Sequence, residues 1–168
     1  MTPGTPKKSR PSGLRPVAGS DPVILILGSY PSLQSLAKCE YYGNPHNRFW
    51  AIIERILGID RTLPYAVRTA RLVNHRVALW DVLATCTRKG SSDATIRDTV
   101  PNDIAGFLSA HPSVRCIALN GQTAGRLFSL KIGSVPKVIL PSTSPANARL
   151  SLEEKTRIWE DCLLAYLK

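Results

Sequence analysis

Short aliphatic runs alternate along the chain with segments in which apolar residues recur at helical spacing. Runs typical of buried strands occupy residues 23–27, 77–80, 114–119 and 137–140. Helices are indicated over residues 47–57, 102–110 and 122–130, and over a last segment that follows residue 151. Strands separated by helices in this way predict an α/β fold. We expect a three-layer α/β/α sandwich around a central, mostly parallel four-stranded sheet.

Two of these helices begin at recognisable capping residues. Asn102 is predicted to cap the helix over residues 102–110. Ser151 and Glu154 have the spacing of a capping box, in which each side chain bonds the backbone of the other residue. We therefore expect the last helix to begin directly after Ser151.

The chain is basic throughout its length. Its 168 residues include 22 Lys and Arg against 12 Asp and Glu, which gives a net charge of +10. Residues 1–20 carry four of these positive charges and no acidic residue, so the remainder keeps +6. A field of this sign attracts polyanions, of which nucleic acid is the commonest and an anionic membrane surface the second.

Residues 1–20 also differ from the rest of the chain in composition. They contain four Pro, three Gly and three Ser, with almost nothing apolar to bury. This composition predicts a disordered basic arm over residues 1–20 that adds affinity for DNA. Residues 21–168 are then expected to form a single domain.

The apolar runs and the cysteines indicate a protein without membrane spans or metal sites. No run approaches the length of a membrane span or of a secretory signal, which predicts a reducing compartment. That compartment is the cytoplasm, with the nucleoid, in a bacterium or archaeon, and the nucleus in a eukaryote. Four cysteines without a C-x-x-C pair are interpreted as small buried hydrophobic residues, and no metal site is predicted.

Polar segments of unusual composition follow each predicted strand. They are residues 28–32, Asp81, Asn120 with Gly121, and residues 141–145. Ligands of parallel sheets bind beyond the carboxyl ends of the strands, so a single pocket is expected to collect all four segments.

Several strings in this order resemble the uracil-DNA glycosylase superfamily, and especially its hypoxanthine (deoxyinosine) branch. They are Gly-Ser-Tyr-Pro-Ser at 28–32, Tyr-Tyr-Gly-Asn-Pro-His-Asn-Arg-Phe-Trp at 41–50, Leu-Trp-Asp-Val-Leu at 79–83, and Leu-Pro-Ser-Thr-Ser-Pro-Ala-Asn-Ala-Arg at 140–149. Order and spacing agree from about residue 23 to residue 168.

The resemblance implies a DNA repair enzyme. Members flip a deaminated base out of the duplex and hydrolyse its N-glycosidic bond without metal or cofactor, leaving an abasic site. We expect a monomeric, monofunctional glycosylase that prefers hypoxanthine. A uracil or G:T/U mismatch glycosylase is the first alternative. A non-catalytic DNA-binding module is the second, because Tyr30 replaces the usual Asp or Asn and the second motif has no His.

The resemblance assigns a catalytic role to Asn47, whose amide can orient a water but cannot accept a full proton. By pattern alone, Asn47 is a helix N-cap, and both roles are compatible. Asp81 has three possible roles: reading the base edge, activating water or capping a turn. Asp93 is a second candidate for the base that activates water.

The resemblance also implies two binding sets. Base-binding residues are expected to be Gly28, Ser29, Tyr30, Phe49 and Asp81, with Phe49 stacking on the extruded base. DNA-binding residues are expected to be Ser32, Arg48, Ser142, Thr143, Ser144, Asn147 and Arg149. Either Ser142 or Ser144 occupies the contact position of the second motif, and either Asn147 or Arg149 fills the space left by the flipped nucleotide.

Overall fold

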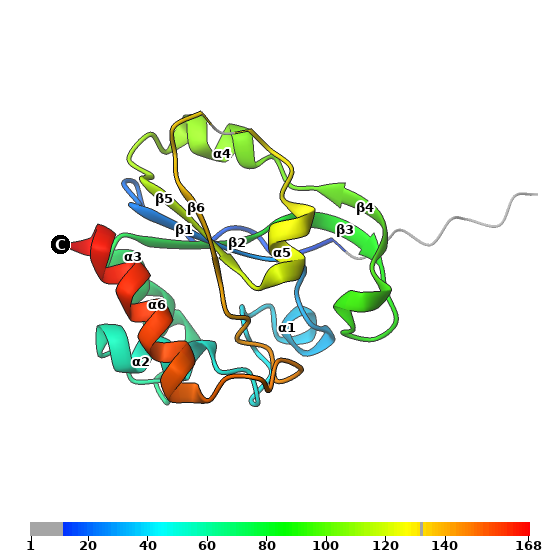
Figure 1. Ribbon diagram of the computed structural model, residues 1–168, viewed down its shortest axis with the longest axis horizontal. Helices are drawn as coiled ribbons and strands as arrows, with labels where there is room; N and C mark the ends of the chain where they lie inside the picture. Colours follow the sequence, from blue (N-terminus) through cyan, green and yellow to red (C-terminus); the bar gives the residue numbers. More distant parts are fainter. Residues whose placement is uncertain (1–11, 132) are drawn as a thin grey trace, which may run out of the picture.

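The computed structural model describes residues 12–131 and 133–168. Its central sheet has four parallel strands in the order β2-β1-β5-β6 (Figure 1). The strands are β1 (Ile24–Gly28), β2 (Val77–Asp81), β5 (Cys116–Asn120) and β6 (Lys137–Leu140). All four coincide with predicted strands to within two residues, so the predicted parallel sheet is confirmed.

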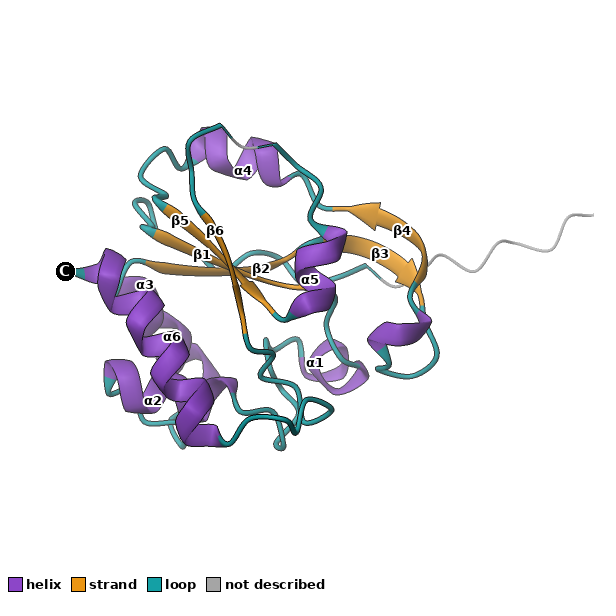
Figure 2. Ribbon diagram, in the orientation of Figure 1, coloured by secondary structure: helices purple, strands orange, loops and turns teal. Residues whose placement is uncertain are grey.

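Helices cover both faces of this sheet, as Figure 2 shows. On one face lie α2 (Phe49–Leu57), α3 (Tyr65–Asn74) and α6 (Leu152–Leu167). On the other lie α4 (Ile104–Ala110) and α5 (Gln122–Leu127). The predicted α/β/α sandwich is therefore confirmed. Among the described residues, no helix is both long and apolar enough to span a membrane.

The strands divide the core into two apolar layers because successive side chains point to opposite faces. Ile24 and Ile26 of β1 pack against α2 and α6, whereas Leu25 and Leu27 pack toward α4. Every residue of β1 is fully buried or nearly so. This burial on both faces explains why β1 reads as a continuous aliphatic run.

An antiparallel hairpin and two helices were not predicted. The hairpin pairs β3 (Leu83–Thr87) with β4 (Arg97–Pro101), and the short 3-10 helix η1 (Asp93–Thr95) lies between them. The additional helices are α3 and α1 (Leu33–Lys38). Because β3 follows β2 directly, the hairpin loop is brought to the carboxyl edge of the central sheet.

The expected disordered arm is wrong for the part of it that the structure describes. Val17 forms an antiparallel bridge with Leu79 of β2, and Gly13 N donates to Ala84 O at 2.8 Å. Leu14 and Val17 pack against the core. Since β2 is an edge strand, this segment covers polar backbone that would otherwise be unpaired. Residues 1–11 lie outside the described residues.

The two predicted caps have different outcomes. Ser151 and Glu154 form the complete capping box at the start of α6, as predicted. The cap of α4 is Asp103, not Asn102, because the Asp103 carboxylate accepts from Gly106 N at 2.9 Å. Asn102 instead donates from Nδ2 to the backbone oxygen of Asp81. It therefore supports the end of β2.

Candidate functional site

A cavity of about 1020 Å³ opens at the carboxyl edge of the sheet. Loops that follow β1, β2, β5 and β6 line it, as expected for a parallel sheet. The predicted site residues that line it are Gly28, Ser29, Tyr30, Ser32, Asn47, Asp81, Ser142, Thr143, Ser144, Asn147 and Arg149. Phe49 and Arg48 are the two predicted site residues that do not line this cavity.

Asp81 ends β2 with its carboxyl group inside the protein. The residue is 4% exposed, and its buried Oδ2 has no hydrogen-bond partner among the residues that the structure describes. Burial, reinforced by the charge of Asp93, raises the pKa of this carboxyl to about 7, although nearby Arg88 acts in the opposite sense. Gly28 makes room for it, because a Cβ at that position would lie 2.6 Å from Asp81 Oδ1. An unsatisfied buried acceptor is therefore presented to the cavity.

Tyr42 lines the cavity together with Tyr30 and Tyr41, whereas Phe49 does not. Phe49 is fully buried and stacks on the Tyr42 ring, with centroids 4.0 Å apart and planes 22° apart. Phe49 also packs edge-on against Trp50 and Trp159. The core encloses the Phe49 side chain, which does not line the cavity, so its contact with a base stays a prediction. The Tyr42 hydroxyl is buried near Asn120, and burial raises the pKa of this hydroxyl.

Asn47 lies where α2 begins and contributes to the cavity wall. The N-cap residue of α2 is Arg48, whose side chain makes no cap bond, but Asn47 Oδ1 accepts from Phe49 N at 2.9 Å and so satisfies the first backbone N–H of the helix. Within the described part of the chain, Nδ2 has no hydrogen-bond partner. The capping role and a water-binding role are thus compatible, since they use different atoms of one amide.

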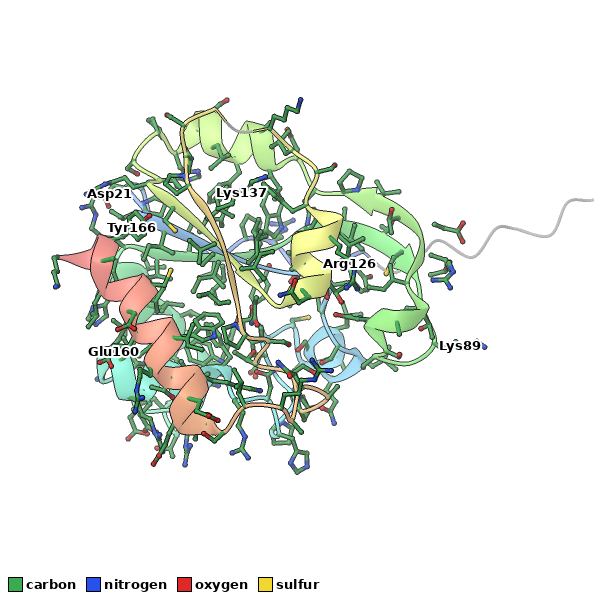
Figure 3. The ribbon with its side chains drawn as sticks, in the orientation of Figure 1. Asp21, Lys89, Arg126, Lys137, Glu160 and Tyr166 are labelled. Atoms are coloured by element: carbon green, nitrogen blue, oxygen red, sulfur yellow. The ribbon has the colours of Figure 1, made fainter. Side chains whose placement is uncertain are left out.

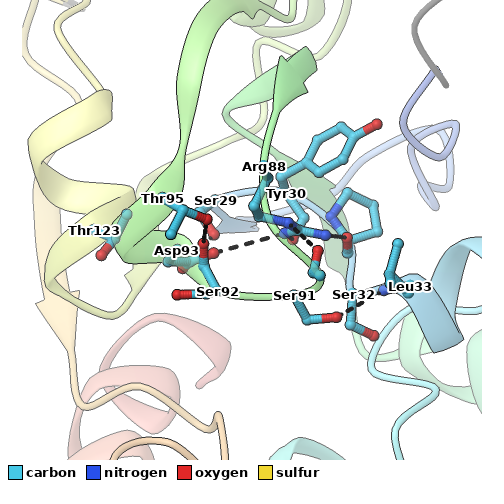
Figure 4. A network of polar contacts seen from close by, with 12 residues as sticks. Ser29, Tyr30, Ser32, Leu33, Arg88, Ser91, Ser92, Asp93, Thr95 and Thr123 are labelled. Carbon is cyan, nitrogen blue, oxygen red and sulfur yellow. Dashed lines mark hydrogen bonds and ion pairs between the residues drawn. The ribbon is translucent and has the colours of Figure 1, made fainter.

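A buried arginine holds the loop after β1 in place (Figure 4). The Arg88 side chain is 4% exposed, and its guanidinium donates to the backbone oxygens of Pro31 at 2.6 Å and Gly90 at 2.9 Å. It also lies 3.7 Å from Asp93 Oδ1. Its neighbour Lys89 is exposed and projects outward from this loop (Figure 3). Arg88 therefore fixes the loop after β1 to the loop between β3 and β4.

Ser29 and Tyr30 are held by the same cluster. Ser29 Oγ donates to Asp93 Oδ2 at 2.7 Å, so both carboxylate oxygens of Asp93 are engaged by neighbours. The Tyr30 ring lies in the second apolar layer with the Arg88 guanidinium 5.0 Å from its centroid. Figure 4 shows this ring directed away from Asp93. Burial raises the pKa of the Tyr30 hydroxyl, so the deprotonated form that could act as a base is even less populated at neutral pH.

The loop after β6 is anchored to β5 through a pair of buried side chains. Asn120 Nδ2 donates to Thr143 Oγ1, and Thr143 N donates to Asn120 Oδ1, each at 3.0 Å. Thr143 is fully buried and both of these groups are used within the protein, so its contact with DNA stays a prediction. Gly121, with a φ of +100°, lets Ser142 approach: a Cβ there would lie 2.9 Å from Ser142 Cβ.

The remaining predicted DNA contacts lie at the rim of the cavity or bond within their own loops. Ser142 Oγ accepts from Ser144 N, and Ser144 Oγ accepts from Ala146 N, each at 3.2 Å. Ser32 caps α1 by accepting from Ser35 N. Arg149 is exposed at the rim. Arg48 is exposed and lines a second, smaller cavity.

The sequence did not predict the roles of three residues of the site. Tyr42 lines the cavity, Arg88 bonds the loop after β1, and Asn120 bonds the loop after β6. Tyr42 lies inside the recognised string but outside any helical stripe, and that position could have marked it as a pocket residue. Asn120 ends a buried strand, where an amide must find a partner inside the protein. The described residues include no cluster of His, Cys, Asp and Glu that could hold a metal ion.

Comparisons with known proteins agree on one family. The model described as the uracil DNA glycosylase superfamily matches residues 16–163. The protein named hypoxanthine DNA glycosylase from Methanosarcina acetivorans is 37% identical over 150 residues, which cover 88% of this chain and 94% of that protein. A protein of the same name from Methanosarcina barkeri is 33% identical over 152 residues, covering 89% and 95%.

A solved structure is similar over nearly its whole length. It is a solution NMR structure from Methanosarcina acetivorans of a candidate uracil DNA glycosylase. It superposes with a TM-score of 0.77 at 36% identity and covers 90% of this chain and 97% of that chain.

Proposed function

The chain belongs to the uracil DNA glycosylase superfamily, and on that premise we propose that it excises a deaminated base, preferably hypoxanthine, from DNA. The base is flipped into the cavity and its N-glycosidic bond is hydrolysed, which leaves an abasic site. The names of the two Methanosarcina relatives and the net charge of +10 support this assignment.

The observation that carries the proposal is the unsatisfied carboxylate oxygen of Asp81. A buried acceptor without a partner lowers the stability of the protein. Hypoxanthine offers its N1–H, which can donate a hydrogen bond to this oxygen. Adenine has an acceptor at N1 and is rejected by the same carboxylate. We assign the hydrogen bond to O6 to a backbone N–H of residues 28–32, which line the same cavity.

Tyr42 supplies the aromatic surface against which the flipped base stacks. One face of its ring is covered by Phe49, and the residue lines the cavity. Bases stack favourably on aromatic rings irrespective of their sequence. Phe49 lies on the other face of the Tyr42 ring and fixes its plane.

Asn47 holds the attacking water. Its Oδ1 is used by Phe49 N, so Nδ2 is the atom that donates to the water oxygen. This hydrogen bond orients the water toward the sugar carbon from which the base departs, where positive charge develops. The amide positions the water and does not take up its proton; in the overall hydrolysis the hydroxyl adds to the sugar carbon and the proton ends on the departing base.

A uracil or G:T/U mismatch glycosylase is the second candidate, since uracil N3–H suits the same carboxylate. The test uses duplexes that carry hypoxanthine, uracil, xanthine or a G:T mismatch, incubated in EDTA and then cleaved at abasic sites with alkali. We expect hypoxanthine to be excised fastest. Complete loss of excision in EDTA, restored by a metal, contradicts the metal-independent mechanism. Binding without any turnover identifies a non-catalytic module.

Asn47→Ala tests the role of the water-binding amide in the same assay. We expect the single-turnover rate to fall by about 10²-fold, the scale of losing a positioned polar group. Loss of the cap alone costs about 1 kcal/mol of stability and leaves the rate of the folded protein unchanged. Asn74→Ala, at the exposed end of α3, is the matched control. A wild-type rate in Asn47→Ala rejects the assignment.

A further inference from the structure

A second cavity, of about 420 Å³, adjoins the base pocket. The two cavities share Ser144, Pro145, Asn147 and Leu150 of the loop after β6. A DNA strand whose nucleotide enters the first cavity therefore passes beside the second.

This second cavity is lined by positive charge without compensation. Arg48 and Lys155 both line it, with His46 also present, and no described residue of its wall is acidic. Lys155 is only 3% exposed, and its Nζ donates to the backbone oxygen of Asn147 at 2.6 Å. No carboxylate of the described residues forms an ion pair with Lys155 or Arg48.

The arrangement is unfavourable unless an anion binds there. Burial of an ammonium without an opposite charge is costly, and one backbone oxygen offsets only part of the cost. Burial and the charge of Arg48 both lower the pKa of Lys155. Lys155 also lies in the second turn of α6, near the positive end of the helix dipole, where a cation is disfavoured. A bound anion would offset all of these costs.

We propose that the cavity between Arg48 and Lys155 binds a backbone phosphate of the DNA strand that carries the flipped nucleotide. This inference rests on the proposed function, because that function places DNA at the mouth of the adjoining pocket. The Lys155 ammonium supplies a buried point charge and Arg48 an exposed guanidinium at the entrance. The phosphate also bridges α6 to the start of α2, so DNA binding stiffens the wall that carries Asn47.

Salt dependence of DNA binding tests this subsite on an undamaged duplex, whatever base the protein prefers. Lys155→Gln should reduce the slope of log Kd against log salt by about 0.9. The variant then loses about 3.5-fold less affinity than wild type between 50 and 200 mM salt. Lys155→Arg retains the charge and should restore the slope. Arg71→Gln is the charge-matched control, because Arg71 is exposed near the end of α3, which leads into the opposite edge of the sheet.

A neutral methylphosphonate placed singly at each linkage around hypoxanthine identifies the phosphate. At one position it should weaken binding by wild type but leave Lys155→Gln unaffected, since both changes remove the same contact. The subsite is rejected if no position shows this coupling and Lys155→Gln has the same slope as Arg71→Gln. Lys155 then only anchors the Asn147 loop, which a lower melting temperature of Lys155→Gln reveals.

Excision of hypoxanthine by wild type, measured on the same duplexes, tests the proposed function separately. If wild type excises hypoxanthine but Lys155→Gln leaves the salt dependence of binding unchanged, the phosphate subsite is overturned and the proposed function is kept. Absence of excision with a reduced slope overturns the hypoxanthine assignment and keeps the phosphate site.

Discussion

At the scale of single residues, the cavity at the carboxyl edge of the sheet contains a carboxyl group, that of Asp81, whose ionisation is unfavourable. The pKa of Asp81 is raised from 3.8 to about 7, chiefly by burial. Below pH 4 the carboxyl is neutral in both folded and unfolded chains and costs nothing. Between pH 4 and 7 the unfolded chain releases the proton while the folded protein retains it, so stability falls as the pH rises. Above pH 7 the cost stays constant, on the order of 4 kcal/mol.

Asp81→Asn should therefore stabilise the protein in a pH-dependent way. We expect its melting temperature to exceed that of wild type at pH 8 and to be similar at pH 4, as thermal denaturation across this range will show. If the ionised carboxylate reads N1–H, wild-type excision of hypoxanthine should also rise with pH to a plateau above about 7. A melting-temperature difference that is constant across the pH range contradicts the buried charge.

Tyr42 and Phe49 form a stacked pair with opposite predicted roles. Tyr42→Ala removes the pocket surface and should slow single-turnover excision, since base stacking is worth about 1–3 kcal/mol. Phe49→Leu changes the core behind it and should lower stability by about 1–2 kcal/mol with a smaller effect on rate. Single-turnover kinetics and thermal melts of both variants separate the roles. The reverse pattern, with Phe49→Leu the slower enzyme, restores Phe49 as the base contact.

Phe49 is a residue for which the helical pattern and the family string predict different roles. The helical stripe of Phe49, Ile52 and Ile53 correctly predicts core packing, and all three are fully buried. The family string suggested a pocket role for an aromatic in the same segment. Only the folded loop shows that Tyr42 lies between Phe49 and the cavity.

At the scale of elements, the sequence predicts those strands that are buried on both faces of the sheet. The strands β1 and β5 are buried along their whole length, so their apolar runs are continuous. The position of a pocket beyond them follows from the direction of parallel strands. This rule brought Asp81 and the loops after β1 and β6 together without any knowledge of side-chain geometry.

Elements stabilised by distant partners carry no such signal. All residues of β4 are exposed, and its sequence Arg-Asp-Thr-Val-Pro has no apolar alternation. It is a strand because β3 pairs with it. The helix α3 buries only Leu72, and its other residues are exposed or half-buried. The role of Arg88 depends on the hairpin loop that these local patterns did not predict.

At the scale of the whole molecule, we expect the N-terminal segment to make two separable contributions. The predicted arm, residues 1–20, carries four basic residues, three of which precede residue 12. Residues 13–18 instead cover the outer edge of β2 and add Leu14 and Val17 to the core. An exposed strand edge promotes pairing with other chains, so this cover protects the sheet as well as stabilising it.

Two deletions separate these contributions. Removal of residues 1–11 eliminates three charges and should flatten the salt dependence of DNA binding by up to about 2.7 in slope. Removal of residues 1–20 also deletes the Val17–Leu79 bridge and two partly buried apolar side chains. That loss is worth about 2 kcal/mol, or roughly 4–8 °C in melting temperature, and it exposes an edge that favours aggregation. Salt titrations by fluorescence anisotropy and thermal melts measure the two effects independently. Equal melting temperatures for the two deletions would show that residues 12–20 contribute only charge, and the edge of β2 would then need no cover.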